Sequence, residues 1–244
     1  MADSRLFVVQ GLFFPNRSKF PGRFSRALKE RAQAIAEQGE SLGVLSHEQL
    51  TGGNRGIANR LLRMARGTAR AVDAAEVFEV DEKILRQSLR AQKGRDAWQE
   101  MAGCANYGFD ASRSFVLMGK LRLLVDGPFN EQRVLWFGRG LRQLSDKEFI
   151  DHYTGHHGPL VASHADVLGI ISYRQVANDH EGLCDTLRGL GLGRAPPPPV
   201  FAQLAMTTPP LGLDSLRARR LATREIKADE KRHIDFGRSM LLLV

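Results

Sequence analysis

The sequence predicts an α+β protein built from two tandem ferredoxin-like repeats. Three observations support this prediction. The chain has 244 residues, enough for two domains of about 120. Short β-branched or aromatic runs alternate with longer stretches of helical periodicity, and their order is similar in both halves. The motif Asp-x-x-Arg-Ser occurs once in each half, about 125 residues apart.

Residues 1–127 form the first predicted repeat. Its expected elements are a strand at 5–14, a helix at 24–38, a strand at 74–80, a helix at 81–92 and a strand at 113–125. The helix at 81–92 opens with two acidic residues, which suit the positive end of a helix dipole. A glycine-rich turn and a basic helix are expected before the second of these strands.

Residues 128–244 form the second predicted repeat. Its expected elements are strands at 133–141, 169–176, 200–206 and 238–244 and helices at 145–156 and 213–234. Ser145 and Glu148 have the capping-box spacing, which predicts where the first helix begins. Gly158 and Pro159 predict that this helix ends near His156. The proline-rich stretch 181–199 is expected to be a loop.

A shared motif relates the two halves. In FDASRSFVLM and IDFGRSMLLL, Asp110 and Ser114 have the same spacing as Asp235 and Ser239. Because Asp110 lies in the half with fewer candidate site residues, we expect a structural role for Asp235, capping a turn or pairing with Arg238. Each half follows the order strand, helix, strand, strand, helix, strand, which predicts an antiparallel sheet with helices on one face. Two such sheets could face each other and enclose a cavity for a small hydrophobic molecule.

Composition excludes several classes of protein. The chain is 43% hydrophobic and 25% charged, as in ordinary globular proteins, and no apolar run reaches the roughly 18 residues of a membrane helix. The amino terminus lacks the features of a secretory signal. Cys104 and Cys184 lie far apart, which excludes a cysteine zinc knuckle and fits a reducing compartment. We therefore expect a cytoplasmic protein that does not associate with membranes.

The formal net charge of +8 comes from an excess of arginine. On a helix, Arg63, Arg66 and Arg70 would share one basic face. The opposite face would carry Ile57, Leu61, Leu62 and Met64. A nucleic-acid surface is one interpretation of the basic face, but aromatic residues for base stacking are not interleaved with it. A solvated helix face is favoured, and no nucleic-acid partner is expected.

The segment FIDHYTGHHGPLVASH contains four of the seven histidines. On a helix, Phe149, Tyr153 and His157 lie four residues apart and share an apolar stripe. His152 and His156 form a second stripe, turned by about 100° from the first. If the apolar stripe faces a cavity, His157 reaches it; the alternative is a core histidine bonded to a backbone carbonyl. The helix end predicted just after His157 would favour its protonated form.

The same segment raises the question of a metal. His152 and His156 have the spacing by which a helix presents two ligands to zinc. The glutamate of an HExxH motif is missing, and a third ligand would have to come from His164, His180, Asp151 or elsewhere. We therefore expect no metal and no other cofactor, and a metal-dependent enzyme stays an alternative.

The series Phe149, Tyr153, His157, Pro159-Leu160, followed by Tyr173 and by ADEKRHIDFGRS, resembles the EthD-domain family. The resemblance is clearest over residues 133–244. It implies a dimeric α+β barrel, formed here as a pseudo-dimer by the two halves of one chain. Most enzymes of this group are metal-free and bind aromatic or lactone-like substrates. The first half has no corresponding histidine, so we expect one site per chain.

The resemblance also implies roles for individual residues. His157 would be the general acid or base, and Tyr153 and Tyr173 would position the substrate. Further candidate substrate contacts are Phe149, His156, Arg139, Arg174 and Trp136. The expected function is a cofactor-independent lyase or isomerase acting on a small hydrophobic, aromatic catabolite or polyketide-like intermediate. Alternatives are a non-catalytic ligand-binding accessory protein, a cofactor-free monooxygenase and the metal-dependent enzyme. A homodimer is also compatible with the sequence.

Overall fold

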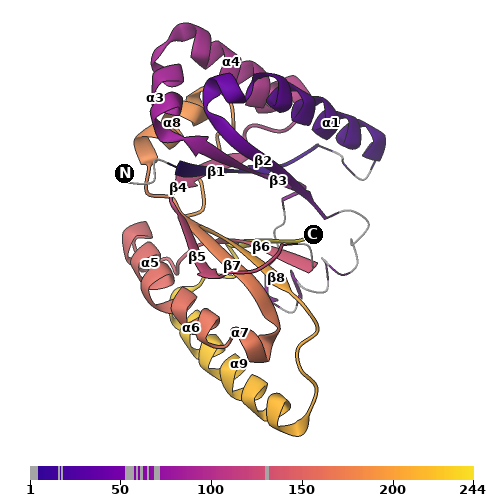
Figure 1. Ribbon diagram of the computed structural model, residues 1–244, viewed down its shortest axis with the longest axis vertical. Coiled ribbons are helices and arrows are strands. Elements are labelled where there is room, and N and C mark those ends of the chain that lie inside the picture. The colour runs from indigo at the N-terminus through magenta and orange to yellow at the C-terminus, as the bar shows by residue number, and fades with distance from the viewer. Residues whose placement is uncertain are drawn as a thin grey trace. The chain divides into compact units, whose positions relative to one another are not determined.

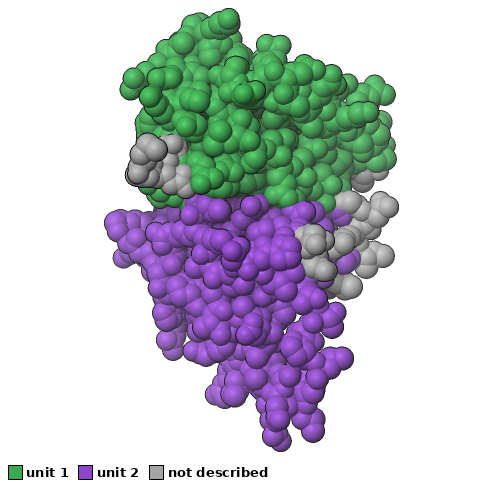
Figure 2. Space-filling model, in the orientation of Figure 1, with its two compact units in different colours: residues 1–51, 72–120, 178–197 green, residues 52–71, 121–177, 198–244 purple. Residues whose placement is uncertain are grey.

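The structure, a computed structural model, describes residues 5–15, 17, 19–52, 58, 60, 63–64, 66–68, 72–129 and 132–244. The chain divides into two compact units, neither of which is continuous in sequence (Figure 2). Unit 1 consists of Met1–Thr51, Val72–Lys120 and Asn178–Pro197, and unit 2 of Gly52–Ala71, Leu121–Ala177 and Pro198–Val244. Each unit therefore includes one connecting segment from the other half of the chain.

Unit 1 contains a four-stranded antiparallel sheet in the order β2-β3-β1-β4. Its strands are β1 (Arg5–Leu12), β2 (Val44–Thr51), β3 (Ala74–Asp81) and β4 (Phe115–Gly119). Its helices are α1 (Pro21–Gln38), α3 (Glu82–Arg90), α4 (Gln92–Ala102) and α8 (Glu181–Gly189), with short 3-10 turns at Glu40–Leu42 and Cys104–Tyr107. The helices cover one face of the sheet (Figure 1).

Three elements of unit 1 were not predicted. Strand β2 is half-exposed and polar over much of its length, so it lacks the apolar run of a buried strand. The predicted helix at 81–92 ends at Arg90, and α4 follows it directly. Helix α8 forms within the predicted loop because Cys184 and Leu187 are buried against the unit 1 core. Burial of one leucine side chain stabilises a fold by about 1.5–3 kcal/mol, more than a weak helix propensity costs.

The predicted strand at 113–125 is two strands that belong to different sheets. Strand β4 ends at Gly119, and β5 (Leu121–Val125) begins after Lys120. The first is fully buried and pairs with β1, whereas the second is more exposed and pairs with a strand of unit 2. Because both strands are mostly apolar, the sequence gives no sign that one strand ends at Gly119 and another begins at Leu121.

Unit 2 repeats the topology of unit 1 with one added edge strand, in the order β5-β7-β8-β6-β9. Its further strands are β6 (Gln132–Gly138), β7 (Ile170–Ala177), β8 (Val200–Met206) and β9 (Met240–Leu243). Its helices are α5 (Asp146–His152), the π-helix η3 (Tyr153–His157), α6 (Gly158–Ser163), α7 (Ala165–Leu168) and α9 (Leu213–His233), all on one sheet face (Figure 1). Without β5, the strand order matches that of unit 1, and the two ferredoxin-like halves are confirmed.

The Asp-x-x-Arg-Ser motif makes the same turn before the last strand of each unit. In unit 1, the N–H of Asp110 donates to the carbonyl of Phe13 at 2.9 Å, and Ser114 Oγ accepts from the N–H of Phe13 at 3.1 Å. In unit 2, Asp235 and Ser239 make the equivalent bonds to the residue after β6, at 2.9 and 3.0 Å. The identical bonding supports the duplication and the structural role expected for Asp235.

Within the described ranges, no helix combines the length and apolarity needed to cross a bilayer.

Candidate active site

A cavity of about 220 Å³ lies within unit 2, between the helix-covered face of the sheet and α9. Its wall is mostly apolar, with Trp136 from β6, Leu204 from β8 and Ile226 from α9 among the residues that line it. The polar groups on the wall are Tyr153, His157, Tyr173, Glu230 and Arg66. This cavity lies under the helices that cover one sheet and belongs to unit 2 alone.

The helix that carries His157 does not end at Gly158, contrary to the prediction. Helix α5 begins at Ser145 with the predicted capping box, widens into the π-helix η3 and continues as α6 to Ser163. The N–H of Gly158 bonds to the carbonyl of Tyr153, five residues earlier. Pro159, at the start of α6, has no N–H to donate to the preceding turn, and the helix nevertheless continues past it. Short π segments inside helices occur frequently at functional sites.

The predicted apolar stripe is buried. Phe149 is 0%, Tyr153 3% and His157 5% exposed, and Tyr153 stacks against His157 with ring centroids 4.8 Å apart. His157 Nδ1 lies 2.8 Å from Oδ2 of Asp229, on α9. The alternative of a bond to a backbone carbonyl is therefore wrong. Among the described residues, Nε2 has no hydrogen-bond partner, so this nitrogen is available to a molecule in the cavity.

The protonation of this pair follows from its surroundings. Burial lowers the pKa of His157, although the hydrogen bond with Asp229 opposes that effect. Burial raises the pKa of Asp229, but the hydrogen bond with His157 and the nearby His152 outweigh it and leave the pKa below its ordinary value. Asp229 is thus a carboxylate and His157 a neutral imidazole near neutral pH. The expectation that a helix end favours protonated His157 is wrong, because no helix ends there.

The two tyrosines form a hydrogen-bonded pair on the cavity wall. Tyr153 and Tyr173 bond through their hydroxyl groups, and Gln175 donates a further hydrogen bond to the Tyr173 hydroxyl. Burial raises the pKa of Tyr153 well above its ordinary value and that of Tyr173 to about 12. Both side chains therefore keep their phenolic protons. Tyr153 donates its proton to the Tyr173 hydroxyl, so the proton of Tyr173 is the one that can be donated to a ligand.

An ion pair lies at the same cavity. Arg66, from the predicted basic helix, bonds to Glu230 with Nη1–Oε1 and Nη1–Oε2 distances of 2.9 and 3.3 Å. The Arg66 side chain is 44% exposed, and that of Glu230 is 11% exposed. Burial raises the pKa of Glu230, and Arg66 opposes that shift. The solvated face predicted for this helix is thus partly wrong, since Arg66 is engaged. Residues 57, 61, 62 and 70 of the same prediction lie outside the described residues.

The other predicted contacts separate into two groups. Trp136 lines the cavity, whereas Phe149 packs behind Tyr153, with ring centroids 5.5 Å apart. Arg174 follows Tyr173 on β7, and since side chains alternate along a strand it points to the opposite face, where its Nε lies 2.8 Å from Oε1 of Gln203. Arg139 and His156 do not line the cavity either, and His156 is 63% exposed.

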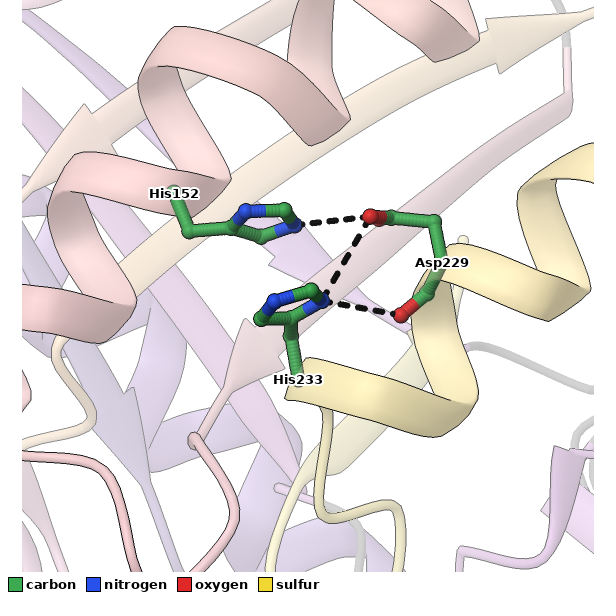
Figure 3. Close-up of side chains that lie close together, drawn as sticks. All are labelled: His152, Asp229 and His233. Carbon is green, nitrogen blue, oxygen red and sulfur yellow. Dashed lines mark hydrogen bonds and ion pairs between the residues drawn. The ribbon is translucent and has the colours of Figure 1, made fainter.

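Further histidines gather around Asp229. His152 Nε2 lies 2.8 Å from its Oδ1, and His156 Nε2 and His233 Nδ1 lie 3.6 and 3.4 Å from the same oxygen. Figure 3 shows His152 and His233 lying face to face beside the carboxylate. With His157 on Oδ2, four histidines surround one buried aspartate. Of the ligands considered from sequence, His164 bonds to Glu225 and His180 to Asp179, away from this cluster.

The sequence carries a signal for the residues that were missed. Asp229, Glu230 and His233 all stand in ADEKRHIDFGRS, which supported the family resemblance. Asp229 and His233 are also four residues apart on a helix and share one face. What the sequence could not show is that this face meets His152 and His157, because 72 residues separate His157 from Asp229.

Comparison with known families decides the nature of this unit. The profile of the EthD domain matches residues 141–237. Residues 141–237 are an EthD domain. The EthD domain includes Tyr153, His157, Tyr173, Asp229 and His233, and it excludes β6 and β9. Among curated proteins, no sequence matches the chain significantly.

Solved structures resemble the whole chain in fold. A single-residue variant of chlorite dismutase from Candidatus Nitrospira defluvii superposes with a TM-score of 0.50 and 8% identity, covering 100% of this chain and 92% of that chain. A second variant gives 0.46 and 8% with the same coverage. A novel heme-binding protein from Thermus thermophilus gives 0.40 and 13%, covering 98% and 90%. The first of these shows that the two ferredoxin-like halves together share the fold of that protein, and the EthD domain lies within the second half.

Proposed function

We propose that the EthD domain is a cofactor-independent lyase or isomerase that moves a proton on a small hydrophobic, aromatic compound. The observation that carries this proposal is His157: it lines the cavity, and the buried Asp229 holds its Nδ1 at 2.8 Å. A carboxylate that accepts the Nδ1–H places the lone pair of the imidazole on Nε2. His157 would therefore act as the base through Nε2.

The proton transfer requires a second group that stabilises the negative charge left on the substrate. When Nε2 removes a proton from a carbon next to a carbonyl, the electron pair moves to the carbonyl oxygen and forms an enolate. The phenols of Tyr153 and Tyr173 line the same cavity. Tyr173 would donate a hydrogen bond to that oxygen, and Tyr153, which donates to Tyr173, would orient it. Return of the proton to another carbon gives an isomer. Departure of a β-substituent with the electron pair gives the lyase product.

The cavity limits the size of the substrate. Its volume of about 220 Å³ is below the 300–1,000 Å³ of pockets that hold drug-sized ligands, so a one-ring compound fits best. Trp136 and the tyrosines offer flat surfaces for such a ring. Arg66 takes the role expected of Arg139 and Arg174, because it is the arginine that lines this cavity among the described residues. A carboxylate or phenolate on the substrate would lie toward Arg66.

Haem does not fit this cavity. The Thermus thermophilus protein is described as heme-binding. His157, with its second nitrogen held by a carboxylate, has the chemistry of a metal-ligating histidine. A porphyrin is nevertheless larger than most drug-sized ligands, and about 220 Å³ is less space than those ligands occupy. The proposed reaction is therefore assigned to the side chains of unit 2 that line the cavity.

Deuterium exchange tests the proposal without any assumption about the product. One-ring ketones, lactones and phenolic acids are incubated with the protein in D₂O, and loss of C–H signals is followed by NMR. We expect exchange or turnover of at least one compound, and a fall of about 10²–10⁴-fold in His157→Gln. His164→Gln is the matched control, because His164 lies on the same stretch of helix but bonds to the exposed Glu225.

A binding measurement distinguishes an enzyme from a protein that only binds the ligand. Trp136 lines the cavity, so in a Trp98→Phe background its fluorescence reports binding. A catalyst predicts that His157→Gln still binds but no longer turns over. Tight binding with neither exchange nor product in the unmodified protein would instead indicate the accessory protein. Unchanged turnover in His157→Gln would overturn the proposal.

A further inference from the structure

We infer that His152, His156, His233 and Asp229 form a binding site for a divalent transition-metal ion such as Zn²⁺, next to the cavity and separate from it. Three of these residues, His152, Asp229 and His233, place their potential ligand atoms within 4.8 Å of one another (Figure 3). None of the four belongs to the residues that line the cavity among the described part of the chain. The inference does not depend on the proposed function.

The distances suit the coordination of zinc. Zinc binds imidazole nitrogen at 2.0–2.1 Å and carboxylate oxygen at 2.0–2.2 Å, so two ligand atoms of a tetrahedral site are separated by about 3.3 Å. From Asp229 Oδ1, His233 Nδ1 lies at 3.4 Å and His156 Nε2 at 3.6 Å. His152 Nε2, at 2.8 Å, must withdraw by about half an ångström. His152, Asp229 and His233 form the preassembled part of the site, and the exposed side chain of His156 is near enough to Oδ1 to move in as a fourth ligand.

The ligands come from two rigid elements. His152 ends α5, and Asp229 and His233 are one turn apart at the end of α9. The rings of His152 and His233 are stacked with centroids 3.4 Å apart and planes inclined by 14°. The stacked rings place Nε2 of His152 and Nδ1 of His233 on the same side of the carboxylate of Asp229. His233 Nδ1 donates to the backbone carbonyl of Asp229 at 3.1 Å, so metal binding requires His233 to give up this hydrogen bond and move its proton to Nε2. The rings of His152 and His233 must also move apart until their lone pairs point to one ion.

The site is open to solvent, as capture of an ion requires. The side chain of His156 is 63% exposed, that of His233 26% and that of His152 19%. The carboxylate of Asp229 lies behind them at 8%. An ion would enter from the side of His156 and reach the buried carboxylate last. Nitrogen-rich ligands select zinc, copper or nickel over magnesium and calcium, which require oxygen.

The second oxygen of Asp229 connects this site to His157. Oδ2 is held by His157 Nδ1 at 2.8 Å while Oδ1 faces the other histidines. A carboxylate that bridges a metal ion and an imidazole fixes the orientation of both. A bound ion would therefore immobilise Asp229, and with it the ring of His157, without touching the substrate.

Zinc titration tests the site. The full-length protein is stripped with a chelator, dialysed and titrated with Zn²⁺ in a calorimeter, and Co²⁺ is used separately as a probe of tetrahedral coordination by its visible absorption. We expect one ion per chain. His152→Ala and His233→Ala should each weaken binding at least ~100-fold, and His156→Ala at least ~10-fold. Thermal unfolding without metal shows that each variant is folded.

Two controls separate this result from others. His180→Ala removes a histidine of unit 1 that bonds to Asp179, and it should bind Zn²⁺ as the unmodified protein does. His157→Gln should also keep zinc while losing turnover, so failure of the metal site and failure of the proposed reaction are distinguishable. Absence of a stoichiometric Zn²⁺ ion, or equal binding by His233→Ala and His180→Ala, would overturn the inference.

Discussion

The two units share one topology but differ in the surroundings of the polar side chain that their first helix contributes. In unit 1, helix α1 delivers Arg31 to the sheet, where its Nε lies 2.6 Å from Oε2 of Glu76 and both side chains are 0% exposed. In unit 2, the helix in the corresponding position delivers His157, which lines a cavity. The first arrangement neutralises charge inside a core, and the second places a histidine in the wall of a cavity.

The difference shows how one fold can carry a site in one copy and a sealed core in the other. Around Glu76, the guanidinium of Arg31, the amide of Gln49 at 3.0 Å and the ring of His47 at 3.6 Å occupy the carboxylate. Burial raises the pKa of Glu76, but Arg31 and His47 outweigh it and bring the pKa down to about 2. A group so fully paired has no capacity for proton transfer near neutral pH. His157, with one partner on Nδ1 and a place in the cavity wall, is the residue for which we propose proton transfer.

The largest expected effect is on catalysis in unit 2. Asp229→Asn removes the carboxylate that accepts the Nδ1–H of His157. The new amide can instead donate to Nδ1, which would place the proton of His157 on Nε2. Turnover should fall by about 10²–10⁴-fold with little change in ligand affinity. Steady-state kinetics on the compound found by deuterium exchange, with Trp136 fluorescence for binding, measures both. Equal turnover in the variant would show that Asp229 does not serve His157.

Breaking the buried pair of unit 1 should cost nearly as much, but in stability. Arg31→Met leaves the Glu76 carboxylate buried without its counterion, which costs about 3–5 kcal/mol in comparable pairs. Urea unfolding at neutral pH, followed by Trp98 in a Trp136→Phe background, reports unit 1. The double variant Arg31→Met with Glu76→Gln should recover part of the loss. No recovery would mean that packing of Arg31, and not its charge, holds the core.

Acid should weaken unit 1 through the same pair. Because the pKa of Glu76 falls from 4.5 to about 2 on folding, the folded state binds its proton less readily than the unfolded state. The stabilisation is complete above pH 4.5 and is lost as the pH falls toward 2. Unfolding midpoints of the unmodified protein and of Glu76→Gln, measured across this range, should converge with acidification. Parallel curves would contradict the assigned charge of Glu76.

The smallest effect is expected for the ion pair at the cavity. Arg66 is nearly half-exposed, so its bond to Glu230 is screened by solvent and contributes about 0–1 kcal/mol to stability. Arg66→Gln should therefore leave the unfolding midpoint of unit 2 almost unchanged, as read by Trp136 fluorescence. A fall in the affinity for acidic ligands, with no change for neutral ligands of the same size, would support the contact proposed for Arg66. If Arg66→Gln and the unmodified protein bind acidic ligands equally well, Arg66 does not make this contact.

Local patterns in the sequence determined much of this protein. Alternation and helical periodicity predicted most strands and helices, the capping box predicted the start of α5, and the stripe of Phe149, Tyr153 and His157 predicted which histidine is buried. The Asp-x-x-Arg-Ser motif predicted the repeat. These features depend on residues within a few positions of one another, where backbone geometry sets which side chains share a face.

Only the tertiary structure decided which distant groups meet. It placed Asp229 beside His157, moved the segment 178–197 into unit 1, divided the predicted strand at Lys120 and carried the helix through Gly158 by means of a π turn. Each of these outcomes depends on packing between segments far apart in the chain, and packing overrides local propensity where apolar side chains are buried. The sequence therefore identified His157, and the fold placed beside it the carboxylate of Asp229, because only the packing of α9 against the histidine helix brings the two together.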